Sequence, residues 1–312
     1  MSFILNGNGD CQVGYTGSGL GSCDITDFGD LKGLLLFRKG WSKDVTDGNV
    51  NYTFKDYQDD VKNKQVFPYI GRYGFTQDTP DNETNTSDTG VTSSIRPGKP
   101  MFSISFTKGG CLHKSLYNKI APNGGIWDYG FIFDNGILLA YNRDESKLKA
   151  FDGGYFDVET FKFLQATDPQ MSTAKMQLVD AEEFNLRHTL IPFTAIGDVD
   201  TYEGVVETKI TVDAITAGDT LSASIVSKCN TESPILDLAD LNNFALLGTQ
   251  ASATAISAVV YNATSGKYDF TVDTPLVATD TVQIKLNDGT YDVAVDSLGG
   301  LYAGASNTVT VS

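Results

Sequence analysis

Basic side chains are scarce in this chain of 312 residues. It has 23 Lys and Arg against 39 Asp and Glu, which gives a formal net charge of −16. Nucleic-acid-binding surfaces need clustered Lys and Arg, and so do polybasic contacts with membranes. The charge balance therefore argues against both classes of partner.

Long hydrophobic runs are also missing. The longest uninterrupted one is Ile137–Tyr141, whereas a membrane-spanning helix needs about 20 apolar residues. The first seven residues, Met1–Gly7, have neither a basic segment nor an apolar core of signal-peptide length. We therefore expect no membrane contact and synthesis in the cytoplasm.

The chain has few residues of the types that make metal and nucleophile sites. Cys11, Cys23, Cys111 and Cys229 form no Cys-x-x-Cys pair, and the only two His residues belong to no nucleophile or zinc motif. Four free thiols are the default, with a Cys11–Cys23 disulfide as the alternative. With only two Trp to build a sugar-stacking cleft, the many acids do not point to glycoside hydrolysis. We predict no enzyme, no catalytic residue, no cofactor and no metal.

The glycine-rich stretch from Gly7 to Gly21 resembles a phosphate-binding loop only in its glycine count. No Gly-Lys-Ser/Thr follows it, and no buried strand and helix enclose it. We predict an arm whose glycines pack closely against other backbone.

Residue types that favour strands and turns are abundant. The 31 Gly, together with frequent Asp, Asn, Thr and Ser, favour an all-β fold. Expected elements are strands in Leu34–Phe37, Phe102–Phe106, Tyr129–Phe133, Gly136–Tyr141 and Ala174–Val179, a helical turn in His113–Tyr117, a turn or short helix in Asp180–Asn185, and turns at Asn135-Gly136 and Phe151–Tyr155.

Composition changes near residue 200. The 110 residues after Tyr202 carry only four Lys and 13 acidic residues, and they alternate apolar and polar side chains. About seven short strands in such a length are typical of an immunoglobulin-like sandwich. The predicted strands are Val205–Val212, Leu221–Lys228, Ala255–Tyr261, Lys267–Val272, Thr281–Leu286, Thr290–Val295 and Thr308–Val311.

The expected fold is thus mainly β. It has a β-sandwich or barrel domain with a short helix over residues 1–200, followed by an Ig-like β-sandwich domain over residues 201–312. A long polar loop is expected at residues 76–100, because Gln77–Gly90 holds no large apolar side chain. Two alternatives stay open for this loop: a surface loop without order of its own, and a segment that orders against a neighbouring subunit.

Short segments of the first 200 residues resemble virion structural proteins of tailed bacteriophages, particularly those of Bacteroidota hosts. The resemblance lies in Phe3–Gly7, Cys11–Gly14, Gly29–Leu36, Phe102–Leu116 and Met176–Asn185. The architecture is most similar to that of a tail-tube protein with a C-terminal Ig-like domain.

This resemblance implies a virion component that assembles with itself into stacked hexameric rings around a channel. The implied partners are copies of the chain and other virion proteins, with DNA only passing through and not bound specifically. The N-terminal arm and the polar loop would join subunits, and the residues expected at those contacts are Asn6, Gly7, Asp78, Asn82, Asn85 and Asp88. The alternatives are a capsid-associated auxiliary, decoration or other head shell protein, and a fibre or adhesin that binds host surface glycans.

Overall fold

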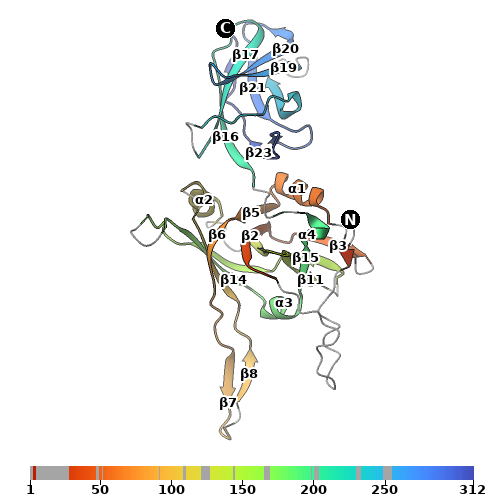
Figure 1. The fold of residues 1–312 in the computed structure, drawn as a ribbon, viewed down its shortest axis with the longest axis vertical. Helices are drawn as coiled ribbons and strands as arrows, with labels where there is room; N and C mark the ends of the chain where they lie inside the picture. Colours follow the sequence, from red (N-terminus) through yellow and green to blue (C-terminus); the bar gives the residue numbers. More distant parts are fainter. Residues whose placement is uncertain are drawn as a thin grey trace. The chain divides into compact units, whose positions relative to one another are not determined.

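The structure is a computed structural model that describes residues 28–46, 52–90, 92–107, 110–120, 127–142, 145–164, 169–197, 199, 204–229, 233–248 and 255–312, and the backbone of 3–4 and 49–50. The chain divides into two compact units, Met1–Tyr202 and Glu203–Ser312. Both units consist mainly of β-strands, so the predicted fold class is confirmed (Figure 1).

Unit 1 contains a nine-stranded sheet that we call sheet I. Its strand order is β1 (Phe3–Ile4), β4 (Asn49–Val50), β3 (Ser42–Thr46), β12 (Lys147–Lys149), β11 (Gly136–Asn142), β10 (Trp127–Phe133), β2 (Leu31–Arg38) and β5 (Val66–Ile70), and β15 (His188–Pro192) also pairs with β11. The predicted hairpin of β10 and β11 is confirmed. Its two turn residues are Asp134 and Asn135, as the bounds of the two predicted strands imply, and Gly136 pairs with Phe133. The Asn135-Gly136 turn signal thus lies one position after the turn.

Sheet II of unit 1 has four strands in the order β13 (Gly153–Val158), β14 (Ser172–Leu178), β9 (Met101–Phe106) and β6 (Arg72–Gln77). The chain passes from β5 of sheet I to β6 of sheet II through Gly71, whose φ of 86° favours glycine. The predicted turn at Phe151–Tyr155 is wrong over most of its length, because Gly153 to Tyr155 begin β13 and pair along β14.

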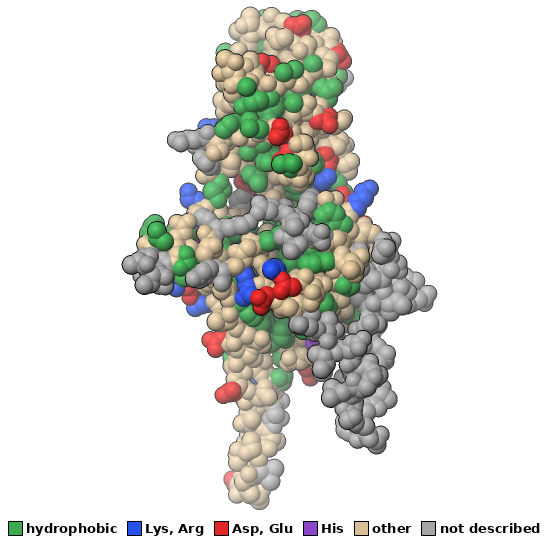
Figure 2. Space-filling view, viewed as in Figure 1, with side chains coloured by type: hydrophobic (Ala, Val, Ile, Leu, Met, Phe, Trp, Pro, Cys, Tyr) green, Lys and Arg blue, Asp and Glu red, His purple; other side chains and the backbone are tan. Residues whose placement is uncertain are grey.

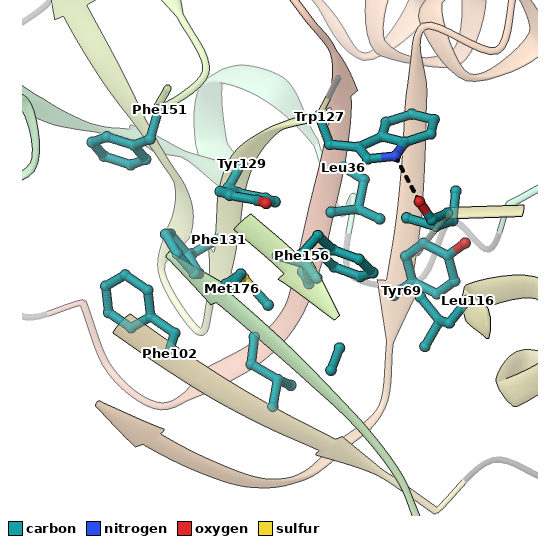
Figure 3. Close-up of a cluster of buried hydrophobic side chains, with 14 of the residues drawn as sticks. Leu36, Tyr69, Phe102, Leu116, Trp127, Tyr129, Phe131, Phe151, Phe156 and Met176 are labelled. Atoms are coloured by element: carbon teal, nitrogen blue, oxygen red, sulfur yellow. Dashed lines mark hydrogen bonds between the residues drawn. The ribbon is translucent and has the colours of Figure 1, made fainter. Parts of the chain in front are cut away.

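The core of unit 1 draws large side chains from both sheets (Figure 3). Phe102 of sheet II lies 5.0 Å from Phe131 of sheet I, ring centroid to ring centroid. Trp127 is 1% exposed and donates its indole N–H to the carbonyl oxygen of Ile120 at 3.1 Å. In β9, apolar and polar residues alternate, so Phe102, Ile104 and Phe106 all point into the core.

Four α-helices belong to the described part of unit 1: α1 (Phe54–Lys62), α2 (Gly110–Ser115), α3 (Ala181–Leu186) and α4 (Phe193–Ile196), and the π-helix Leu116–Ile120 follows α2. The predicted helical turn at His113–Tyr117 and the predicted strand and helix around Asp180 are confirmed. Helix α1 was not predicted. Its local signal is the capping box of Thr53 and Asp56, with Tyr57 and Val61 buried one turn apart.

Unit 2 contains two sheets around its own core. One has the order β19 (Ile256–Asn262), β20 (Lys267–Leu276), β17 (Gly218–Ser227), β16 (Val206–Val212), β23 (Leu301–Ala303) and β22 (Ala294–Val295); the other has β18 (Phe244–Gly248), β21 (Thr281–Leu286) and β24 (Val309–Thr310). The short 3₁₀-helix Leu241–Asn243 precedes β18. Tyr268, Phe270 and Ile284 lie in the core.

All seven strands predicted in this half of the chain are present. The strand expected at Thr290–Val295 is reduced to two residues. Strands β18 and β23 were not predicted, because Phe244–Gly248 is a short apolar run and Leu301–Ala303 has only three residues. That the sandwich belongs to the Ig-like class stays a prediction.

Candidate assembly surface

The polar segment after β6 forms a hairpin arm. Strands β7 (Glu83–Thr86) and β8 (Thr92–Arg96) pair antiparallel, and this pair extends the β6–β9 hairpin of sheet II outward (Figure 1). The expectation of a loop without regular structure is therefore wrong over these strands. The signal that could have revealed them is Thr84 and Thr86 in one strand and Thr92 in the other, since Thr suits a ladder.

The base of the arm is held by backbone contacts. The N–H of Asp78 donates to the carbonyl oxygen of Met101 at 2.9 Å, and the N–H of Gly98 donates to Asn82 Oδ1 at 3.1 Å. A β-carbon at Gly98 would overlap the carbonyl oxygen of Pro80, so only glycine allows this close approach. The two segments of the arm therefore leave sheet II side by side, as one ribbon.

Farther out, the arm is held by hydrogen bonds between its own polar side chains. Glu83 forms an ion pair with Arg96 at the start of the ladder. The hydroxyl groups of Thr86 and Thr92 lie 2.9 Å apart across the strands. At the tip, Gly90 has a φ of 80° and donates its N–H to the carbonyl oxygen of Ser87 at 2.8 Å. The described side chains of residues 78–97 other than 91, 94 and 95 are all exposed.

Four residues predicted at subunit contacts lie on this arm. Asp78, Asn82, Asn85 and Asp88 are all exposed, from the base to the tip. Asn82 also has a structural role, because it accepts the hydrogen bond from Gly98. The other two predicted contact residues, Asn6 and Gly7, lie outside the described residues, as do Cys11 and Cys23.

Sheet II offers two edges beside the arm. Within the described ranges, β6 pairs only with β9, and β13 pairs only with β14. Outer strands can accept a strand from another chain through backbone groups on their outer side. In β13 some of these groups already have partners, because the Gly153 N–H donates to Asp128 and the Tyr155 carbonyl oxygen accepts from the Tyr129 hydroxyl group. Sequence reasoning could not locate these edges, because strand order depends on pairings between distant segments.

A network of charges supports the junction of the two sheets. Asp128 of β10 is 3% exposed and accepts hydrogen bonds from the N–H groups of Gly40, at 2.9 Å, and Gly153, at 3.1 Å. Lys39 Nζ lies 2.9 Å from a carboxylate oxygen of Asp128 and 2.9 Å from one of Asp152. Burial lowers the pKa of Lys39, but these two carboxylates outweigh it and raise the pKa above its ordinary value.

The outward face of sheet II carries its own ion pairs. Lys175 Nζ lies 2.7 Å from a carboxylate oxygen of Glu159, and this contact lowers the pKa of Glu159. Tyr155 lies on the same face, because it pairs with Gln177 across the ladder. Its pKa is raised by partial desolvation and by the neighbouring Asp157.

One small open cavity of about 220 Å³ lies where β2 begins and the chain turns at Gly71. Its charged residues bind one another: Lys32 Nζ is 2.7 Å from Asp134 Oδ1, and Arg72 is 3.7 Å from Asp30. The hydrogen bond from Lys32 lowers the pKa of Asp134. We see a local charge cluster here and not a ligand site.

Within the described residues, no group of three or more His, Cys, Asp or Glu side chains is placed to hold a metal ion. Cys111 is half-buried and Cys229 is exposed. No helix in the described ranges is long and apolar enough to span a membrane. No protein-family model matches the sequence, and a comparison with curated proteins finds no match.

Proposed function

We propose that this chain is a structural protein of a bacteriophage virion, and that it builds the tail tube as stacked hexameric rings around a DNA channel. The observation that carries the proposal is the hairpin arm formed by β7 and β8. Its described side chains are exposed along both strands and add nothing to the core of unit 1.

Ordering a segment of this length has a large entropic cost that must be offset by interactions. Among the described residues of the arm, the contacts are those of its own ladder, the Glu83–Arg96 ion pair and hydrogen bonds between polar groups. A two-stranded ribbon without an apolar face is marginally stable in water. Contact with another copy would supply the missing partners, so the arm supports a role in assembly.

The edges of sheet II support the same proposal. Strand addition joins chains through backbone hydrogen bonds and makes little demand on side-chain identity. A contact between two different surfaces of identical subunits closes into a ring when the rotation between them allows it. Unit 1 offers such different surfaces in β6, β13 and the arm.

The charge is consistent with a channel for DNA. Of the net charge of −16, −9 falls after Tyr202, which leaves −7 for unit 1. An acidic lumen repels phosphate groups, so the duplex can slide without binding to the wall. In this arrangement unit 1 forms the ring and unit 2 decorates the particle.

The test is negative-stain electron microscopy of the purified full-length protein at increasing concentration. We expect six-fold rings that stack into tubes. The matched variant replaces residues 79–100 with Asn-Gly, a two-residue turn that suits the hairpin of Gln77 and Phe102. It should keep the melting temperature of unit 1 and lose stacking.

Two outcomes would contradict the proposal. A monodisperse monomer or trimer at every concentration would favour a decoration protein or an adhesin, and capsid-binding and cell-binding assays would then separate those two. Loss of the folded state in the arm variant would show that the arm serves stability of the monomer and not assembly.

A further inference from the structure

A group of exposed aromatic and aliphatic side chains lies at the far end of the β13–β14 hairpin. Phe163 is 77% exposed and Leu164 is 75% exposed, which is unusual for large apolar side chains. The ring of Phe163 lies 5.6 Å from that of Phe161, and Phe161 lies 5.0 Å from His113. We call Phe161, Phe163, Leu164 and the 52% exposed Tyr117 the Phe163 tip.

The tip is held in place by the rest of unit 1. Lys162 and Met171 form an antiparallel backbone pair across the hairpin, with N–H···O distances of 3.0 and 2.9 Å. The ring of His113 stacks on Tyr117 and lies 3.0 Å through Nδ1 from the hydroxyl group of Ser172. The tip is therefore presented to solvent on an anchored hairpin.

The margin of the tip is basic, although the chain as a whole is acidic. Lys114 and Lys162 are exposed beside it, and Glu159, 3.4 Å from Lys162 Nζ, is the acid near them, so basic side chains outnumber acidic ones among the described residues of this margin. Figure 2 shows basic and acidic side chains beside hydrophobic ones at the surface of unit 1. A surface that covers the Phe163 tip should thus be apolar at its centre and acidic around it.

Such a surface exists at the opposite end of the same hairpin. Tyr155 and Val179 are 44% and 42% exposed, and a β-carbon at Gly154 would lie 3.1 Å from Val179 Cγ2. Around them lie three exposed acids, Asp157, Asp180 and Glu182, and one lysine, Lys175, whose charge is paired with Glu159. We call this surface the Tyr155 patch.

We propose that the Phe163 tip of one copy docks on the Tyr155 patch of the next copy. The tip cannot reach the patch of its own chain, because both lie on one hairpin and β13 alone spans about 20 Å. The contact joins two different surfaces, so it repeats from copy to copy. The inference rests on the proposed function, since it names a contact within the ring.

The tip by itself is smaller than a stable interface. An aromatic anchor such as Phe buries roughly 150–250 Å², whereas a standard interface buries about 800 Å² on each partner. The docking therefore works together with the arm and the edges of sheet II. Central apolar anchors nevertheless carry most of the binding energy of an interface, so they are the right residues to change.

The first experiment measures self-association by sedimentation velocity in the full-length protein. Leu164→Glu and Val179→Glu should each weaken it by about tenfold or more, because each places a charge in the apolar centre. Leu298→Glu is the matched control, since Leu298 is 90% exposed in unit 2 and belongs to neither surface. Unchanged association in Leu164→Glu would overturn the inference.

The second experiment maps the contact with a photo-crosslinking amino acid at position 163. We expect cross-links in peptides that contain Tyr155 or Val179 of another copy, identified by mixing isotopically labelled and unlabelled chains. Cross-links to other surfaces, to added lipid vesicles or to nothing would overturn the inference.

These results separate the two proposals. Rings and tubes that persist in Leu164→Glu would overturn the docking contact and leave the tail-tube function standing. Cross-links from tip to patch in a protein that forms only dimers or open chains would support the contact and contradict the tail-tube function.

Discussion

The indole N–H of Trp41 donates a hydrogen bond to the carboxylate of Asp60, 3.0 Å away, and this contact ties helix α1 to sheet I. The hydroxyl group of Tyr52 donates to the same carboxylate at 3.1 Å, and Lys43 Nζ lies 3.0 Å from it. Trp41 and Tyr52 are 8% and 1% exposed, so Asp60 satisfies donors that water cannot reach.

We expect Asp60→Ala to lower the free energy of unfolding of unit 1 by about 2–4 kcal/mol. The substitution leaves two buried donors without an acceptor and a lysine without its partner. Denaturant unfolding followed by Trp fluorescence measures the change, since both Trp lie in unit 1. The control is Asp59→Ala in the same helix. If it lowers the free energy of unfolding as much as Asp60→Ala does, the role assigned to the Asp60 carboxylate is contradicted.

Asp128 and Asp152 offer a matched pair, because both bind Lys39 but only Asp128 is buried. We expect Asp128→Ala to destabilise unit 1 by about 3 kcal/mol, since two backbone N–H groups lose their acceptor. Asp152→Ala, at a half-exposed site, should cost less than about 1 kcal/mol. Thermal unfolding of the two variants under identical conditions measures the difference, and equal losses would argue against the buried network.

The capping box of α1 predicts a dependence of stability on acid. Partial burial raises the pKa of Asp56, but the hydroxyl and N–H groups of Thr53, at 2.6 and 2.8 Å, and nearby lysines outweigh it and lower the pKa. A carboxyl whose pKa is lower in the folded state stabilises the protein above its unfolded value, about 3.9, and loses that effect as the pH falls through the folded pKa.

Melting temperature should therefore decline below about pH 4, and less steeply in Asp56→Asn. Thr53→Ala keeps the carboxyl group but removes its donor hydroxyl, so it should also flatten the decline. Differential scanning calorimetry between pH 2 and 7 measures these curves. If the melting temperature of both variants falls with pH as steeply as that of the unsubstituted protein, other carboxyl groups dominate the acid dependence.

Gly98 allows the base of the arm to be tested without shortening it. Gly98→Ala places a methyl group against the carbonyl oxygen of Pro80, so the two segments at the base of the arm must move apart. We expect faster proteolysis between residues 78 and 99 and an unchanged melting temperature of unit 1. Gly110→Ala is the control, because a β-carbon there meets nothing within 4 Å. Equal proteolysis of the two variants would contradict the role of Gly98.

Strands with strict alternation could be predicted from the sequence. Phe102–Phe106 and Lys267–Val272 place every second side chain inward, and the structure confirms both. Helix α1 was missed because its capping box is short and its apolar stripe consists of little more than Tyr57 and Val61. The arm was missed because its polar residues gave no core-facing pattern.

The candidate assembly surface was predictable only in part. The polar character of residues 76–100 marked the arm as a segment outside the core, and Asp78, Asn82, Asn85 and Asp88 are exposed on it. The Phe163 tip and the Tyr155 patch were not predicted, because exposure of an apolar side chain depends on which neighbours cover it. From the sequence alone, Phe161 and Phe163 would be expected in the core, because they are large and apolar.

Side-chain alternation and charge are local properties, so the mainly β class and the change of composition near residue 200 follow from the order of the amino acids alone. Which strands lie at an edge, and where the arm leaves the sheet, depend on how distant segments fold together. The tertiary structure also decides which apolar side chains stay outside. Each of these depends on pairings such as Gln77 with Phe102 and Phe131 with Leu34, between segments that are far apart in the chain. Such pairings result from burial of one shared core, which no local pattern specifies.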